Sequence, residues 1–135
     1  MKCLIVEDDF TTRNFIQKYL VGYGDCDVAV DGVEAIEGFR KALAEKKPYD
    51  LICLDIMMPH MDGHQVLTTI RKIESEHDIL DLNGTKVIMM TSLKDGKNVI
   101  GAFKEGCEAY LTKPVGKKQL LEKIEELGIV KLKAD

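Results

Sequence analysis

The sequence has no long apolar run and no apolar leader. Its hydrophobic residues never approach the roughly 18 consecutive positions that a membrane-spanning helix needs. Only a short apolar stretch separates Met1 from the acidic residues Glu7, Asp8 and Asp9, so there is no signal-peptide core. We therefore expect a soluble, cytoplasmic protein that does not insert into a membrane.

Closely spaced cysteine pairs and an excess of basic charge are also missing. None of the 4 cysteines forms a C-x-x-C pair, which argues against a structural zinc site and a dithiol redox motif and favours buried or incidental thiols. The net charge of −4 argues against broad electrostatic binding to nucleic acid. No glycine-rich phosphate loop follows the first predicted strand, which argues against a nucleotide-binding domain.

Strands and helices alternate along the chain, whose 135 residues are close to one ordinary domain. Short apolar runs predict strands over Lys2–Val6, Asp25–Val30, Asp50–Asp55, Lys86–Met90 and Ala109–Thr112. Apolar residues at helical spacing predict helices over Thr12–Val21, Val33–Lys46, Asp62–Glu76, Asp95–Glu105 and Lys117–Leu127. This alternation predicts an α/β fold with a five-stranded parallel sheet covered by helices on both faces.

Polar side chains gather where the predicted strands end. They are carboxylates, hydroxyls and one ammonium, contributed by Glu7, Asp8, Asp9, Asp55, Thr91, Ser92, Thr112 and Lys113. In a doubly wound sheet, ligands bind at the carboxyl ends of the strands. Two carboxylates about 5 Å apart repel by roughly 3 kcal/mol at an effective dielectric of about 20, so the cluster must hold a proton or a hard cation.

This donor set indicates a particular chemistry. Oxygen ligands with few carboxylates suit Mg²⁺, which usually shares its coordination with phosphate. A carboxylate beside such an ion can act as a nucleophile toward phosphorus and form an acyl phosphate. The sequence therefore predicts a phosphoryl-transfer site at the carboxyl edge of the sheet.

Four segments together resemble the receiver domain of two-component response regulators: LIVEDD, LICLDIMMPHMDG, VIMMTS and YLTKP. The resemblance covers residues 1–127, which we assign to a receiver domain, and leaves 128–135 as a short tail. It implies a flavodoxin-like, doubly wound sheet with strand order 2-1-3-4-5 and five helices.

The resemblance also implies roles for the acidic residues. Asp55 is expected to accept the phosphoryl group. Asp9 and Asp55 are expected to ligate Mg²⁺ together with the backbone carbonyl of Met57, while Asp8 reaches the ion through a water molecule.

The remaining motif residues are expected to contact the phosphoryl group and to carry the signal. Thr91 and Lys113 would contact the phosphoryl oxygens, with a cis peptide bond between Lys113 and Pro114. Thr91 would be drawn toward the new charge, Tyr110 would move into the vacated space, and the surface formed by residues 95–127 would change.

Two departures from the common receiver pattern affect these expectations. In the family, the residues two positions after the phosphoacceptor and two after the threonine tune the phosphate lifetime; here they are Met57 and Leu93, both apolar. Because apolar side chains cannot orient an attacking water, we expect slow autodephosphorylation. The segment over residues 74–85 is longer than the usual connection at this place, and local packing or a partner contact would each explain its apolar residues.

The expected function is a phosphorylation-activated switch, not an enzyme beyond self-catalysed phosphoryl transfer and autodephosphorylation. Its partners would be a sensor histidine kinase or phosphotransfer protein and a downstream protein effector, without direct nucleic-acid contact. It would be a monomer or a phosphorylation-dependent dimer. Three alternatives remain: a receiver from a larger regulator or hybrid kinase, a receiver that binds partners without phosphate, and a phosphohydrolase with an aspartate nucleophile, although Met57 stands where that class has a second Asp.

Overall fold

Five parallel strands form one sheet in the order β2-β1-β3-β4-β5, which confirms the predicted topology. The computed structural model describes residues 1–58, 60–79, 83–92 and 106–129. Its strands are β1 (Lys2–Val6), β2 (Asp25–Ala29), β3 (Leu51–Asp55), β4 (Lys86–Thr91) and β5 (Ala109–Thr112). Every strand end lies within one residue of its predicted position.

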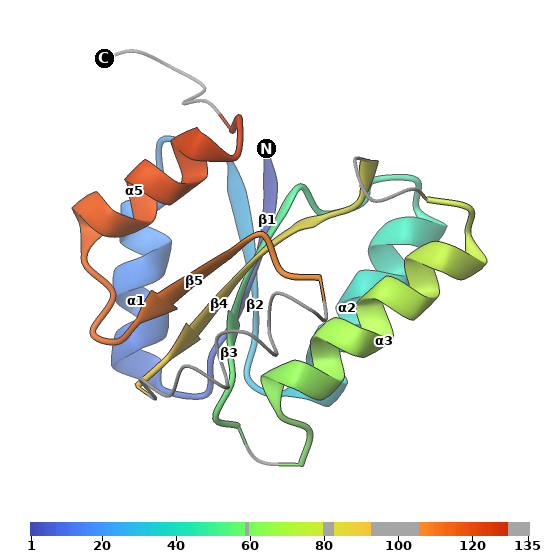
Figure 1. Cartoon of the computed structure of the whole chain (residues 1–135), viewed down its shortest axis with the longest axis horizontal. Coiled ribbons are helices and arrows are strands. Elements are labelled where there is room, and N and C mark those ends of the chain that lie inside the picture. The colour runs from blue at the N-terminus through green and yellow to red at the C-terminus, as the bar shows by residue number, and fades with distance from the viewer. Residues whose placement is uncertain (59, 80–82, 93–105, 130–135) are drawn as a thin grey trace.

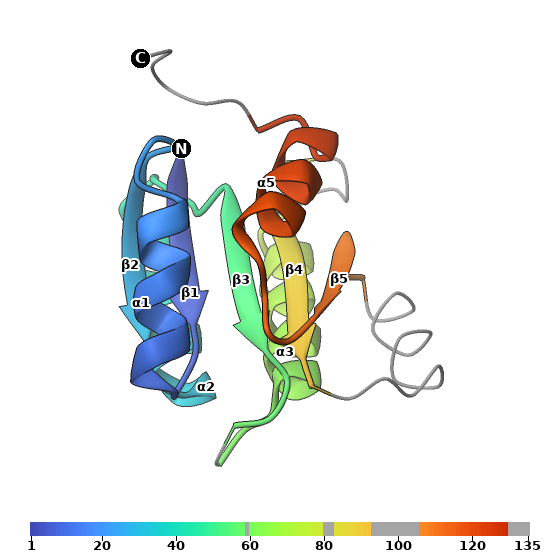
Figure 2. The same ribbon diagram turned by 90° about the vertical axis from the view of Figure 1, so that its left-hand side faces the viewer.

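Helices cover both faces of this sheet, as predicted. The described helices are α1 (Phe10–Tyr19), α2 (Gly32–Ala44), α3 (Gly63–Glu76) and α5 (Lys117–Glu126). Figures 1 and 2 show α1 and α5 on one face of the sheet and α2 and α3 on the other. The helix predicted over 95–105 and most of the predicted tail, residues 130–135, lie outside the described residues. In the part of the chain that is described, no helix is both long and apolar enough to cross a membrane.

The central strands are apolar along their whole length because both of their faces are covered. All residues of β3 are buried. One core, which includes Phe39 and Ile52, lies under α2 and α3, and a second, which includes Ile16 and Ile124, lies under α1 and α5. Two separate cores therefore hold the sheet from opposite sides.

Acidic residues cap the starts of three described helices: Asp9 for α1, Asp31 for α2 and Asp62 for α3. The Asp9 carboxylate accepts hydrogen bonds from the backbone N–H of Thr12 at 2.9 Å and from its hydroxyl at 2.6 Å. This cap starts α1 at Phe10, two residues before the predicted start. Asp62 and Gln65 form a reciprocal capping box at the start of α3.

Two partly buried ion pairs of Arg71 hold the end of α3. The Arg71 guanidinium contacts the Glu74 carboxylate at 2.7 Å and the Glu108 carboxylate at 2.8 Å. Glu74, which is buried, also accepts a hydrogen bond from the backbone N–H of Thr85 at 2.7 Å. The described ends of the long 74–85 segment are therefore held by local contacts, while residues 80–82 lie outside the described residues.

Replacing Gly63 with alanine should destabilise the fold at the end of β3. A Cβ at Gly63 would lie 2.6 Å from the carbonyl oxygen of Asp55 and 2.8 Å from the Cα of Ile56, and these backbone atoms cannot yield without moving Asp55. We expect Gly63→Ala to lower the free energy of unfolding in urea by roughly 1–3 kcal/mol.

A matched control is Gly38→Ala within α2, where the new Cβ would meet its nearest neighbour, the Tyr49 hydroxyl, at an ordinary 3.7 Å. This substitution should leave stability unchanged or raise it by about 0.5–1 kcal/mol, because alanine favours helix. Equal effects at the two positions would contradict the close approach at Gly63.

Candidate functional site

The predicted polar residues meet at the carboxyl edge of the sheet. Parallel pairing places Asp55 at the end of β3 opposite Met90, one residue before Thr91 on β4, and places Thr91 opposite Thr112 on β5. At the end of β1, the backbone N–H of Glu7 donates to the carbonyl of Ala29 on β2 at 3.0 Å, so Glu7 continues the strand direction. The arrowheads in Figure 2 show the strand ends at this common edge.

Lys113 joins two buried carboxylates across this edge. Its Nζ lies 2.7 Å from Oε2 of Glu7 and 3.2 Å from Oδ1 of Asp55. Glu7 is 0% exposed and Asp55 is 1% exposed, so both carboxylates are shielded from water. One ammonium therefore serves two buried acids, and the cluster carries an excess of negative charge whenever both are ionised.

A third carboxylate, that of Asp8, completes an acidic group that could hold a metal ion. One oxygen from each of Glu7, Asp8 and Asp55 lies within 4.8 Å of the others, and Asp8 is exposed. Hard oxygen donors at the carboxyl edge of the sheet fit a divalent cation such as Mg²⁺. The residues present are thus compatible with the predicted ion.

The close packing of these charges shifts their protonation. Burial raises the pKa of Glu7 to about 7, with a further increase from the charge of Asp55 and an opposing effect of Lys113. Burial also raises the pKa of Asp55, although Lys113 opposes this. Burial disfavours the charge on Lys113, but its contacts with Glu7 and Asp55 outweigh burial and raise its pKa. Lys113 therefore keeps its positive charge, while Glu7 is partly protonated near pH 7.

The structure does not bring Asp9 into this group, which departs from the predicted set of ligands. The Asp9 carboxylate turns to Thr12 as the cap of α1, and these hydrogen bonds lower its pKa. Glu7 takes the place predicted for Asp9 in the acidic group, together with Asp8 and Asp55. The shift by one residue follows from the early start of α1, which turns Oδ2 of Asp9 to the backbone N–H and hydroxyl of Thr12.

The sequence interpretation included Glu7 in the polar cluster but gave it no role as a metal ligand. Three consecutive acids, Glu7, Asp8 and Asp9, follow β1, and only two of them join Asp55 in the acidic group. Their spacing alone does not show which two. A usable signal was present, because an acid three residues before Thr12 matches a helix cap. Recognising that cap assigns Asp9 to α1 and leaves Glu7 and Asp8 for the site.

The other predicted residues have these positions. Thr91 is buried at the end of β4, and the backbone N–H of Lys113 donates to its carbonyl at 2.7 Å. Tyr110 is half-buried on β5 and packs against the core under α2 and α3. Met57 is 59% exposed, and its N–H donates to Oδ1 of Asp55 at 3.3 Å. The Lys113–Pro114 peptide bond is cis, and Leu93 lies outside the described residues.

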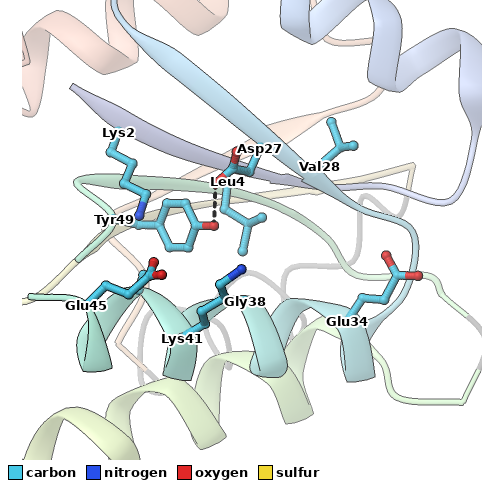
Figure 3. Close-up of a pocket in the computed structure, with 10 residues that line it drawn as sticks. Lys2, Leu4, Asp27, Val28, Glu34, Gly38, Lys41, Glu45 and Tyr49 are labelled. Carbon is cyan, nitrogen blue, oxygen red and sulfur yellow. Dashed lines mark hydrogen bonds between the residues drawn. The ribbon is translucent and has the colours of Figure 1, made fainter. Parts of the chain in front are cut away.

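A hollow of about 380 Å³ lies between β2 and α2 (Figure 3). The Tyr49 hydroxyl donates to Asp27 inside it at 2.7 Å. Its lining combines side chains of both signs: Lys2, Lys41, Asp27, Glu34 and Glu45. Because these charges offset one another, the hollow selects no ligand charge, and we assign it no function.

Comparisons with known proteins converge on one family. Residues 3–125 match the family described as response regulator receiver domain. The chain is 34% identical to regulatory protein VanRB of Enterococcus faecalis, covering 94% of this chain and 52% of that protein. It is 35% identical to the probable transcriptional regulator ycf29 of Porphyra purpurea, covering 92% of this chain and 54% of that protein.

A solved structure agrees with these sequence matches. The structure of the Francisella response regulator 1452 receiver domain aligns with a TM-score of 0.74 and 34% identity, covering 93% of this chain and 94% of that one. The chain therefore matches a whole solved receiver domain but spans about half the length of the curated relatives.

Magnesium titrations of single variants test the ligand assignment. We expect Asp8→Asn and Glu7→Gln each to weaken Mg²⁺ binding at least about tenfold in isothermal titration calorimetry, because each removes a negative oxygen donor. Asp9→Ala should bind Mg²⁺ within about threefold of wild type yet have a lower free energy of unfolding, because the cap of α1 is lost. Loss of binding in Asp9→Ala, with binding retained in Glu7→Gln, would restore the original prediction.

Stability should depend on pH through Glu7. Its folded-state pKa of about 7 exceeds the ordinary value of 4.5, so the folded state binds more protons than the unfolded state between these values. The free energy of unfolding, measured in urea with EDTA, should therefore fall as pH rises from about 4.5 to about 7. The fall should be smaller in Glu7→Gln, and an identical profile in the two proteins would exclude this role for Glu7.

Proposed function

This chain belongs to the response regulator receiver domain family, and from that premise we propose that it is a switch controlled by phosphorylation of Asp55. The observation that carries the proposal is the buried Asp55 carboxylate, 3.2 Å from the Lys113 ammonium and beside Glu7 and Asp8. Receiver domains are the phosphorylated partners in two-component signalling. The proposed donor is the phosphohistidine of a sensor histidine kinase or of a phosphotransfer protein.

Asp55 acts as the nucleophile in this proposal. A carboxylate oxygen of Asp55 attacks the phosphorus, the bond from phosphorus to the histidine nitrogen breaks, and the histidine leaves. Lys113 stabilises the growing negative charge on the phosphoryl oxygens, as a fixed ammonium does in other phosphoryl-transfer sites. Glu7 holds Lys113 in place through the 2.7 Å ion pair.

Glu7, Asp8 and Asp55, with the predicted backbone carbonyl of Met57, would hold Mg²⁺ in this site. When bound, the ion neutralises charge on the phosphoryl oxygens and so lowers the barrier to attack by a carboxylate. Asp8, which is exposed, leaves an open side from which phosphate can approach. Asp9, whose Oδ2 caps α1, is not a member of this acidic group.

The proposed response passes from Thr91 through β5. A phosphoryl group on Asp55 adds about −1.5 to −2 charge and strong acceptors near the Thr91 hydroxyl. Thr91 moves toward it, and Tyr110 on the neighbouring strand enters the space that Thr91 leaves. The surface of residues 95–127 then changes for a protein partner; exposed Lys117 and Lys118 at the start of α5 suit an acidic one.

The setting of this switch is part of the proposal. Because the chain spans about half of its curated relatives, it acts either alone or as the receiver of a larger regulator. We propose a cytoplasmic location, a protein effector without direct nucleic-acid contact by this domain, and a monomer that can dimerise on phosphorylation.

Phosphorylation from a small donor tests the proposal. Intact-mass analysis after incubation with acetyl phosphate and Mg²⁺ should show one phosphoryl adduct that hydroxylamine removes. The adduct should be absent with EDTA and in Asp55→Asn, because both the cation and the acceptor oxygen are needed. An adduct that persists in Asp55→Asn would place the acceptor elsewhere, and a rapid release of inorganic phosphate without any adduct would favour a phosphohydrolase.

The phosphate lifetime tests the role of the apolar flanking residues. Met57 and Leu93 lack groups that orient water, so the phosphorylated wild type should hydrolyse slowly. Met57→Asn, which adds a hydrogen-bonding side chain at an exposed position, should shorten the half-life several-fold in a phosphate-release assay. Met57→Leu is the control and should leave the half-life unchanged. Equal half-lives for all three proteins would show that Met57 does not affect the phosphate lifetime.

A further inference from the structure

Three cysteines lie together on the face of the sheet that α1 and α5 cover. Cys3 on β1 pairs directly opposite Cys26 on β2, and Cys53 on β3 is opposite Ile5, two residues along β1 from Cys3. Positions paired across parallel strands, and positions two apart along a strand, face the same side. Cys3 and Cys53 belong to the core under α1 and α5, and Cys26 packs against that core.

The thiols of this group influence one another. Cys3 lowers the pKa of Cys26, helped by the amino-terminal ammonium and opposed by burial and by Asp25 and Asp27. Cys26 and Cys53 raise the pKa of Cys3, as does burial. A negative charge on the pair therefore resides on the sulfur of Cys26.

Solvent reaches this group through Cys26. Cys3 and Cys53 are 0% exposed, whereas Cys26 is half-buried on β2, the edge strand of the sheet. An oxidant arriving from solvent meets Cys26 first, and Cys3 lies opposite Cys26 on the neighbouring strand. The arrangement combines an accessible thiol of increased acidity with a buried partner, as in thiols that are oxidised selectively.

We propose that Cys26 is a peroxide-reactive thiol whose oxidised form is resolved by Cys3 as a disulfide linking β1 to β2.

Strand geometry favours Cys3 over Cys53 as the site of the bond. Neighbouring strands lie about 4.8 Å apart, within the range of Cα separations that a disulfide spans. Cys3 and Cys53 are offset by two residues as well, which gives a Cα separation of about 8 Å, too long without backbone movement. Oxidation should therefore join Cys3 to Cys26 and leave Cys53 as a thiol.

The reaction has two steps. The thiolate of Cys26 attacks one oxygen of hydrogen peroxide, the O–O bond breaks, and a sulfenic acid forms as hydroxide leaves and takes up a proton to become water. Cys3 then attacks the sulfur of Cys26, the S–O bond breaks, and the oxygen leaves as a second water with the proton of the Cys3 thiol. Two thiols and one peroxide thus give one disulfide and two water molecules.

Peptide mapping of the full chain tests this proposal without phosphorylation, so its outcome is independent of the proposed switch. After hydrogen peroxide, the intact mass should fall by about 2 Da, with two fewer thiols labelled by N-ethylmaleimide in denaturant and a linked Cys3–Cys26 peptide that dithiothreitol separates. A sulfenic acid on Cys26 that persists in the wild type, a pairing with Cys53 or Cys107, or an unreactive Cys26 would each overturn it.

Single variants separate the two roles. Cys26→Ser should form no disulfide and consume peroxide at least about tenfold more slowly. In Cys3→Ala, a dimedone adduct should accumulate on Cys26 because the resolving thiol is gone, and circular dichroism would check its fold. Cys107→Ser is the control and should lose about 2 Da like the wild type. The wild-type linked peptide decides the question even if Cys3→Ala does not fold.

Discussion

The site depends on one constraint: two buried carboxylates share a single ammonium. Lys113 lies within 2.7 Å of Glu7 and 3.2 Å of Asp55, and neither acid reaches water. Because like charges in a poorly solvated place repel, the cluster is most stable with a proton on Glu7 or with a cation beside it. A parallel sheet produces this arrangement by ending β1 and β3 at the same edge.

The same contacts connect the site to the rest of the fold. Lys113 follows β5, and its backbone N–H donates to the carbonyl of Thr91 at the end of β4. A change of charge at Asp55 therefore acts on Lys113 and, through this hydrogen bond, on Thr91. Tyr110 lies on β5, just before Lys113, and packs against the core under α2 and α3. This continuity supports the proposed route from phosphorylation to the surface of residues 95–127, in which the packing of β5 is the element with two arrangements.

The local sequence pattern predicted the fold well, and it predicted the site except that Glu7 takes the place predicted for Asp9. The strands were predictable because β1, β3 and β4 are buried on both faces and so read as unbroken apolar runs. The choice between Glu7 and Asp9 was not, because it depends on where α1 begins, which a single capping contact to Thr12 decides. The pairing of Cys3 with Cys26 was equally hidden, since spacing along the chain does not give the register between β1 and β2.

Carboxyl carbon NMR of Glu7, Asp8, Asp9 and Asp55 across pH, with and without Mg²⁺, measures the shared-ammonium constraint directly. The account predicts that Glu7 titrates near 7 without Mg²⁺, that Mg²⁺ lowers the pKa of Glu7, and that Asp9 titrates below its ordinary pKa in both conditions. The account would be contradicted if Glu7 titrated at its ordinary pKa with and without Mg²⁺ while the pKa of Asp9 changed when the ion was added.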